Sequence, residues 1–186
     1  MTVNEVMRQT EEKMNKTGEL FRKEMLTLRA GRAHPSVLDK VTVDYYGTPT
    51  PITQLATVNV PEPRLLTILP WDRGITAAIE KAILKSDLGL TPNSDGTVIR
   101  LNFPALTQDR RRDLVKGLHK RSEEEKVSIR NLRRAAVDSL KAGEKDGRLS
   151  EDECRRGQDE VQKMTDRHIR EIETITAAKE KEIMEV

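Results

Sequence analysis

The sequence predicts an α+β protein, in which a small, mostly β, α/β domain is inserted into a long antiparallel three-helix bundle. Among the 186 residues, 34% are charged and 35% are hydrophobic, a balance typical of long, exposed helices. Apolar residues recur every three or four positions near both ends of the chain. The middle instead alternates, and it holds seven of the eight prolines between residues 35 and 92. Two kinds of packing are therefore expected in one chain.

The first helix is expected to begin at Thr2. Thr2 and Glu5 fit a capping box, in which each side chain accepts a hydrogen bond from the other residue's backbone N–H. A seam with heptad-like spacing follows, formed by Val3, Met7, Thr10, Met14, Thr17, Phe21, Met25 and Leu28. Gly31 can adopt a positive φ and Pro35 opposes helix continuation, so the helix is expected to end at residues 29–32.

The middle segment changes from a helical to a β-type pattern. Four strands are expected, at residues 41–45, 55–60, 65–69 and 97–101. Turns rich in Pro, Gly and Asp are expected at 47–51 and 92–96, and a short amphipathic helix at 75–84. This composition predicts a compact domain of its own.

Two long helices are expected after the middle segment. Thr107 is the expected N-cap of the first, which continues to about Lys145. After a tight turn at residues 146–149, Ser150 and Glu153 form a second capping box. The last helix then runs close to Val186.

These elements predict a discontinuous bundle domain, residues 1–30 and 106–186, and an inserted domain, residues 31–105. Only two short connections join the domains, and such connections favour a hinge over a fused interface. We expect an L-shaped molecule whose hinge residues are Gly31, Ala33, Pro35, Phe103, Pro104 and Ala105.

The stretch from Lys126 to Ala136 combines a seam with a row of cations. On a helix, Ile129, Leu132 and Ala136 share one face. The sector beside it holds Lys126, Arg130, Arg133 and Arg134. Between Arg110 and Arg134 there are ten basic and four acidic residues.

The three arginines of this row have few acidic neighbours. Asp138, four residues after Arg134, is the only acid three or four positions from any of them. Unpaired guanidinium groups suit bidentate phosphate contacts, so we expect a polyanionic partner. Because aromatics are only 3% of the residues, recognition through stacked bases is not expected.

Other chemistry finds little support in the sequence. There is no phosphate-binding loop, nucleophile elbow or metal-spaced pair of His or Cys, so we expect neither an enzyme nor a cofactor or metal. His168 and Cys154 fall on an apolar stripe and are interpreted as core residues. The single cysteine, the polar N-terminus and the lack of a long apolar run predict a cytoplasmic protein without a membrane span.

Two functions remain open from the residues alone. One is a factor that binds folded RNA through the row of arginines. The other is a helical scaffold or oligomeric coiled-coil adaptor that associates through its seams and uses the inserted α/β domain as its recognition module. The salt dependence of binding would distinguish the two functions, because phosphate contacts weaken steeply with ionic strength and association through apolar seams does not.

Along nearly its whole length the chain resembles the bacterial ribosome recycling factor family. The resemblance rests on strings that occur in the right order and at the right separations: Gly31–Ala33 with Pro35–Ser36, Val43–Gly47, Glu80–Ile83, Ser86–Leu90, Asp95–Gly96 with Ile99–Arg100, Leu106–Thr107 with Arg110–Arg111, Arg130–Asn131 with Arg133–Arg134, and Gln162–Lys163 with Thr165–Asp166.

The resemblance implies a monomer of roughly the dimensions of tRNA, with no cofactor. Its implied partners are the post-termination ribosome and elongation factor G, with which it splits the ribosome into subunits as GTP is hydrolysed. It also implies that bundle arginines contact ribosomal RNA of the large subunit. Together with the helical row, this gives a predicted RNA-binding set of Arg133, Arg130, Arg134, Arg110, Arg29, Arg32 and Lys126. Ala135 departs from the family pattern, in which many members carry an acid after the arginine pair.

Overall fold

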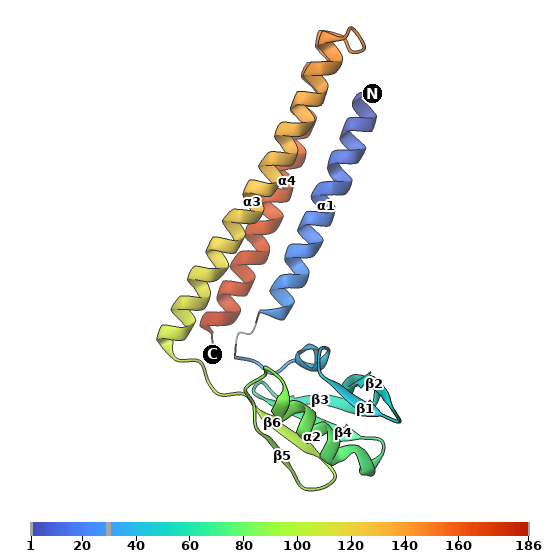
Figure 1. Cartoon of the computed structure of the whole chain (residues 1–186). Helices are drawn as coiled ribbons and strands as arrows, with labels where there is room; N and C mark the ends of the chain where they lie inside the picture. The colour runs from blue at the N-terminus through green and yellow to red at the C-terminus, as the bar shows by residue number, and fades with distance from the viewer. Residues whose placement is uncertain (1, 29–30, 186) are drawn as a thin grey trace. The chain divides into compact units, whose positions relative to one another are not determined.

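The computed structural model of the chain describes residues 2–28 and 31–185. The chain divides into two compact units (Figure 1). The helical unit comprises the residues up to Leu28 together with Gln108–Glu185, and the small unit is the segment between them. The helical unit is therefore assembled from two stretches of chain, and the predicted α+β class is confirmed.

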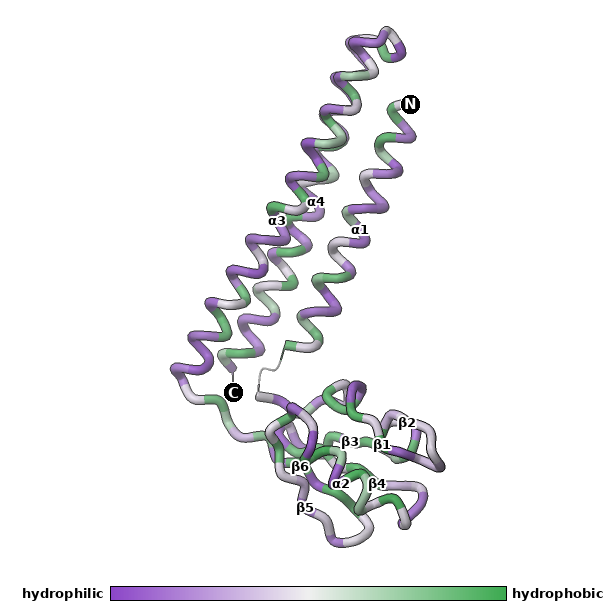
Figure 2. The backbone as a smooth tube through the Cα atoms, in the orientation of Figure 1, coloured by the Kyte–Doolittle hydropathy of each residue, from purple (hydrophilic) through white to green (hydrophobic). Residues whose placement is uncertain are grey.

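The helical unit is a three-helix bundle. Its helices are α1 (Val3–Thr27), α3 (Gln108–Lys145) and α4 (Glu151–Met184). Helices α1 and α4 run in the same direction, and α3 runs opposite to both (Figure 1). Apolar residues recur along each helix, as the green segments of Figure 2 show. The predicted bundle is confirmed.

Both predicted capping boxes are present. The N–H of Glu5 donates to the Thr2 hydroxyl over 3.2 Å, and the N–H of Thr2 donates to the Glu5 carboxylate over 2.8 Å. The same pair of bonds joins Ser150 and Glu153 at the start of α4. The end of α1 was predicted too late. Leu28 already has an extended ψ of 115°, and its N–H bonds back to the carbonyl of Glu24.

The bundle core mixes apolar and polar side chains. Met14, Phe21, Ile129, Leu140 and Val161 are completely buried. Among them lie several buried hydroxyl groups, and those of Ser122 on α3 and Thr176 on α4 are 2.9 Å apart. Close to the α3–α4 turn, a Cβ on Gly157 would lie 3.0 Å from Leu140 and 3.2 Å from Val3. The three helices therefore approach closely at that end.

The small unit contains two antiparallel sheets and one helix. Strands β1 (Thr42–Tyr45) and β2 (Thr48–Pro51) form a hairpin. A four-stranded sheet has the order β3-β4-β6-β5, and helix α2 (Thr76–Lys85) adds its apolar face to the same core. The strands of the larger sheet are β3 (Ala56–Glu62), β4 (Leu65–Pro70), β5 (Pro92–Ser94) and β6 (Ile99–Asn102). Short 3₁₀ helices connect these elements at Pro35–Leu38, Ile52–Gln54 and Arg73–Ile75.

Strands β2 and β5 correct the sequence prediction, which gave turns at these positions. Each of them pairs with a single neighbour in its sheet. Proline lacks an N–H for the sheet ladder, so prolines are tolerated on such edge strands. The turn between β1 and β2 is shorter than predicted and contains Tyr46 and Gly47, both with positive φ.

The core of the small unit is a single apolar cluster. Leu66, Ile68, Ile79, Ile83 and Ile99 are all completely inaccessible to solvent. These residues come from β4, α2 and β6, so the cluster joins the helix to the sheet. Across the described residues of both units, no helix is long and apolar enough to cross a membrane.

Candidate nucleic-acid interface

Helix α3 carries the predicted row of cations near its middle. Ile129 and Ala136 are buried and Leu132 is half-buried, as the predicted seam requires. Since α3 is an unbroken helix from Gln108 to Lys145, burial of this seam fixes the direction in which the neighbouring basic side chains leave the helix. The four basic side chains, Lys126, Arg130, Arg133 and Arg134, have different environments.

Lys126 departs from the prediction, because acidic side chains neutralise it. Its Nζ lies 3.0 Å from Glu123 Oε1 and 3.1 Å from Glu173 Oε1, and only 14% of its side chain is exposed. The hydrogen bond to Glu123, with a further one to Glu173, raises the pKa of Lys126. This ammonium serves the α3–α4 contact, so we remove Lys126 from the predicted RNA-binding set.

Arg133 is half-buried and oriented by helix α4. Its Nη1 donates to Gln162 Oε1 over 2.9 Å, and Gln162 Nε2 in turn donates to Asp166 Oδ1 over 2.9 Å. The Nε of Arg133 is buried and has no hydrogen-bond partner among the described residues. The guanidinium group is therefore held in place by a neutral amide.

Arg130 and Arg134 are exposed, and neither forms an ion pair with any residue in the described part of the chain. Arg130 contributes to a lowered pKa of Glu123, although Lys126 is the main cause. We call Arg130, Arg133 and Arg134 the arginine ridge. It offers two exposed cations without an ion pair to a described residue and one oriented cation on a single helix, an arrangement suited to phosphate oxygens.

The other predicted RNA-binding arginines do not join the arginine ridge. Arg110 is exposed and lies 20 residues before Arg130 on α3, about 30 Å along the helix axis. It takes part in an interaction of its own within the protein. Arg32 is exposed and belongs to the small unit, and Arg29 lies outside the described residues.

Three of the predicted hinge residues are built into the small unit. Ala33 is buried and its N–H donates to the carbonyl of Pro63 over 2.7 Å. Phe103 is buried too, and its N–H donates to the carbonyl of Arg64 over 2.8 Å. Pro35 begins a 3₁₀ helix.

A hinge residue must change its backbone angles freely, which these contacts oppose. The prediction therefore narrows to Gly31 and Ala105, together with Pro104, whose ring fixes φ and leaves only ψ free to change. Gly31 has a φ of 79°, and a Cβ there would lie 2.9 Å from the Leu106 side chain.

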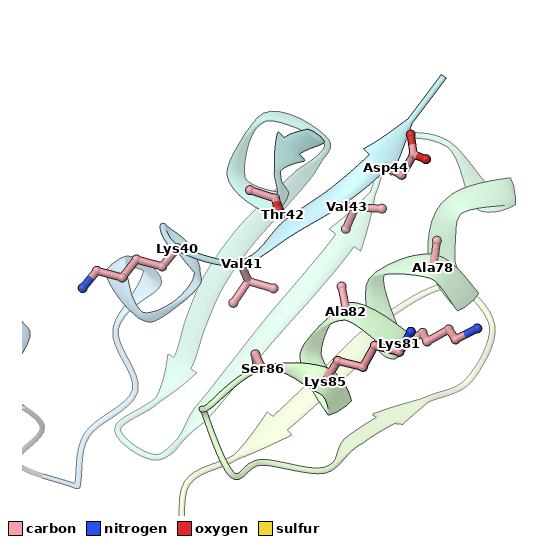
Figure 3. Close-up of a pocket in the computed structure, with 10 residues that line it drawn as sticks. All are labelled: Lys40, Val41, Thr42, Val43, Asp44, Ala78, Lys81, Ala82, Lys85 and Ser86. Atoms are coloured by element: carbon pink, nitrogen blue, oxygen red, sulfur yellow. The ribbon is translucent and has the colours of Figure 1, made fainter. Parts of the chain in front are cut away.

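A groove in the small unit offers a weaker alternative site. It has a volume of about 430 Å³ and lies between β1 and α2. Three lysines and Asp44 line it, but Lys40 points away on one side while Lys81 and Lys85 project from α2 on the other (Figure 3). The ammonium groups do not converge, so the groove has no defined anion site.

Titratable core residues show no sign of catalytic use. Burial raises the pKa of the Cys154 thiol, which makes it a poor nucleophile. Burial lowers the pKa of His168, whose Nε2 has no hydrogen-bond partner in the described part of the chain. Within residues 2–28 and 31–185, no three His, Cys, Asp or Glu side chains are placed to hold a metal ion.

Sequence reasoning missed Gln162 and Asp166 as parts of the site. A signal for them exists in the acids of α4, because Asp159, Asp166, Glu173 and Glu180 recur every seven residues. That repeat predicts a polar strip facing a neighbouring helix. Which residue of α3 each acid faces depends on the register between the helices, and the sequence does not contain that register.

Comparison with known proteins decides the family. The model of the family described as "Ribosome recycling factor" matches residues 21–184. The chain belongs to the ribosome recycling factor family. A ribosome-recycling factor of Syntrophomonas wolfei subsp. wolfei is 57% identical over 184 residues, which cover 99% of this chain and 100% of the relative.

Two solved structures of recycling factors share the fold. A solution structure of the ribosome recycling factor is 42% identical, with a TM-score of 0.80 over 99% of this chain and 98% of that one. The second is a T. thermophilus ribosome recycling factor, described together with E. coli elongation factor G bound to the E. coli post-termination complex. It is 43% identical, with a TM-score of 0.66 over 99% of this chain and 100% of that one.

Proposed function

We propose that this protein recycles ribosomes after termination. It binds the post-termination ribosome and, with elongation factor G and GTP hydrolysis, separates the subunits and releases the ribosome from the mRNA. Full-length identity of 57% to a ribosome-recycling factor supports this function. So does the likeness to a recycling factor described with elongation factor G bound to the post-termination complex. Such work on ribosomes takes place in the cytoplasm.

We propose further that the arginine ridge binds phosphates of large-subunit ribosomal RNA. The observation that carries this step is the lack of carboxylate contacts. Arg130, Arg133 and Arg134 have no ion pair with a described residue, whereas the nearby Lys126 has two. Charge that the protein leaves uncompensated on one helix face is available to a polyanion.

The scaffold alternative receives less support from the helical seams. Met14 and Phe21 of α1, Ile129 of α3 and Ile172 of α4 are all buried within this one chain. A seam that is already buried in its own bundle has little apolar surface left for a partner helix. Recognition through surface cations therefore fits the helical unit better.

The test compares wild-type protein with Arg133→Ala in two assays. We expect the wild type to split post-termination ribosomes in the presence of elongation factor G and GTP, measured by light scattering. Arg133→Ala removes a charge-assisted contact worth about 1.5–3 kcal/mol, so affinity for 70S particles should fall about tenfold to a hundredfold. The salt dependence of log K should also become shallower by about one.

Arg8→Ala is the matched control, since it removes the same charge from an exposed position on α1. We expect it to retain wild-type affinity within about twofold, because surface changes away from a site alter free energies by about 0.5 kcal/mol or less. Unchanged 70S affinity of folded Arg133→Ala would refute the ridge assignment. Failure of the wild-type protein to split ribosomes would refute the function itself.

A further inference from the structure

The contacts between α3 and α4 repeat at intervals of seven residues. His119 Nε2 lies 3.0 Å from Glu180 Oε2, and Lys126 Nζ lies 3.1 Å from Glu173 Oε1. Because the helices are antiparallel, a step of seven residues forward on α3 matches a step of seven backward on α4. The third basic residue of this series is Arg133, and the third acid is Asp166.

The third position breaks the series. Arg133 and Asp166 form no ion pair, and the amide of Gln162 connects them instead. The amide carbonyl accepts from Arg133 Nη1, while the amide nitrogen donates to Asp166 Oδ1, each over 2.9 Å. One neutral side chain thus satisfies both charged groups and keeps them from direct contact.

An amide partner in place of a carboxylate leaves the positive charge of Arg133 uncompensated. A carboxylate on the guanidinium would be a charge-assisted partner that any phosphate would have to displace. An amide holds the group through a weaker, neutral acceptor and leaves Nη2 and one hydrogen of Nη1 for a ligand. Holding a long side chain in one orientation also reduces the entropy that it loses on binding.

We propose that Gln162 is a positioning residue for Arg133, which orients the guanidinium and at the same time keeps Asp166 from neutralising it. The inference rests on the proposed function, in which Arg133 contacts ribosomal RNA. It adds a specific role for an uncharged residue on a different helix. Through its hydrogen bond, Gln162 holds the Arg133 guanidinium in one orientation and leaves its positive charge available to phosphate.

Gln162→Glu is the direct test, because it keeps the shape of the side chain and replaces the amide by a carboxylate. The new carboxylate is repelled by Asp166 and accepts from Arg133 as an ion pair. We expect affinity for 70S particles to fall about fivefold to tenfold, a smaller loss than for Arg133→Ala. The slope of log K against log salt should become shallower, since the Arg133 charge is already paired.

A double-mutant cycle of 70S affinities distinguishes a positioning role of Gln162 from a purely structural one. If Gln162 acts through Arg133, then Gln162→Glu in an Arg133→Ala background causes no further loss of affinity. Circular dichroism and thermal melts establish that each variant is folded. Fully additive losses of affinity would overturn the inference, because they would show that the added charge acts independently of Arg133.

Gln9→Glu is the control for the charge change. Gln9 is exposed on α1 and lines the opposite flank of α3, beside Leu132 and Ala135. We expect its 70S affinity to stay within about twofold of the wild type. An equal loss in Gln9→Glu and Gln162→Glu would overturn the inference.

The proposed function and the positioning role fail in different ways. Wild-type protein that does not bind 70S particles would overturn both. Wild-type protein that binds, together with a weakened Arg133→Ala and an unchanged Gln162→Glu, would overturn the positioning role alone.

Discussion

The two units of the chain bury different kinds of side chains. Of the nine buried polar or charged residues in the described part of the chain, only Thr76 lies in the small unit. The other eight belong to the helical unit and are Thr10, Arg111, Ser122, Glu125, Thr165, His168, Thr176 and Lys179. The small unit is thus held by apolar packing, and the bundle by apolar packing combined with polar pairing.

Geometry explains the difference. A helix packed on a sheet encloses a wide apolar layer, as Ile79 and Ile83 do against Leu66 and Ile68. Three long helices share only a narrow seam, so polar side chains reach its edges and must find partners there.

Between-helix ion pairs then line the surface of the bundle. Arg22 Nη2 is 2.7 Å from Glu171 Oε1, and Arg121 Nε is 2.9 Å from Glu24 Oε2. Other basic side chains of the bundle have no such partner. Among them, Arg130 and Arg134 form no ion pair with a described residue, which leaves them available for binding.

The largest effect is expected from Ile68→Ala in the small unit. Removing a completely buried isoleucine side chain from β4 should lower the free energy of unfolding by about 2–5 kcal/mol, because it leaves a cavity in an apolar core. Urea unfolding, with hydrogen exchange to assign the loss to this unit, measures it. Leu69→Ala, which truncates the exposed neighbour on the same strand, should cost about 1 kcal/mol or less. Equal costs at the two positions would contradict apolar packing as the interaction that holds the small unit together.

An intermediate effect is expected from acidification of the bundle. Burial lowers the pKa of His168 below 6.5, with Arg167 acting in the same direction and Glu171 and Glu11 opposing it. The unfolded chain therefore binds the proton more readily. Stability should fall as the pH drops below about 6.5, by up to about 1.4 kcal/mol per pH unit, until the folded protein also takes up the proton.

His168→Gln separates this contribution from other titrations. Because Gln is uncharged at every pH, the variant should lose less stability than the wild type between pH 7.5 and 5.5. Urea unfolding at both pH values gives the comparison. Parallel losses in wild type and variant would show that other groups cause the acid sensitivity.

The smallest effect is expected for the ion pair between Arg22 and Glu171. Their side chains are 54% and 46% exposed, so water and salt screen the attraction. A double-mutant cycle should give a coupling free energy of about 0.2–1 kcal/mol in low salt. At about 1 M salt, where the screening length is about 3 Å, the coupling should be almost zero. A coupling free energy that is unchanged by salt would show that the pair is shielded from solvent, and it would contradict this prediction.

Local signals in the sequence predicted much of this fold. The capping boxes at Thr2 and Ser150 and the helical seams depend on residues only three or four positions apart, and they were predicted correctly. Strand β2 was missed because its residues 48–51 contain two prolines, which resemble a turn until pairing with β1 is known. The fold class followed from the contrast between the two patterns.

The candidate site was predictable only in part. The unpaired state of Arg130 could be read from the absence of acids three or four positions away. For Arg134 it could not, because Asp138 lies four positions later and only the structure shows that the two form no ion pair. The neutralisation of Lys126 by Glu173 could not, because those residues are 47 positions apart and meet only through the register of two helices. For the same reason, the bridge that Gln162 forms to Arg133 became visible only in the folded chain.

The two capping boxes lie close together, since Thr2 and Glu153 line the same groove at one end of the bundle. Two helix N-termini there bring their partial positive charges side by side, and the carboxylates of Glu5 and Glu153 offset them. Hydrogen bonds from the backbone N–H groups of Thr2 and Ser150 lower the pKa of both glutamates. The stability that depends on His168 begins to fall below about pH 6.5, whereas both glutamates stay ionised at least down to their ordinary pKa of 4.5. The order of events in acid follows: the bundle is destabilised first at its middle, while the first turns of α1 and α4 are still capped.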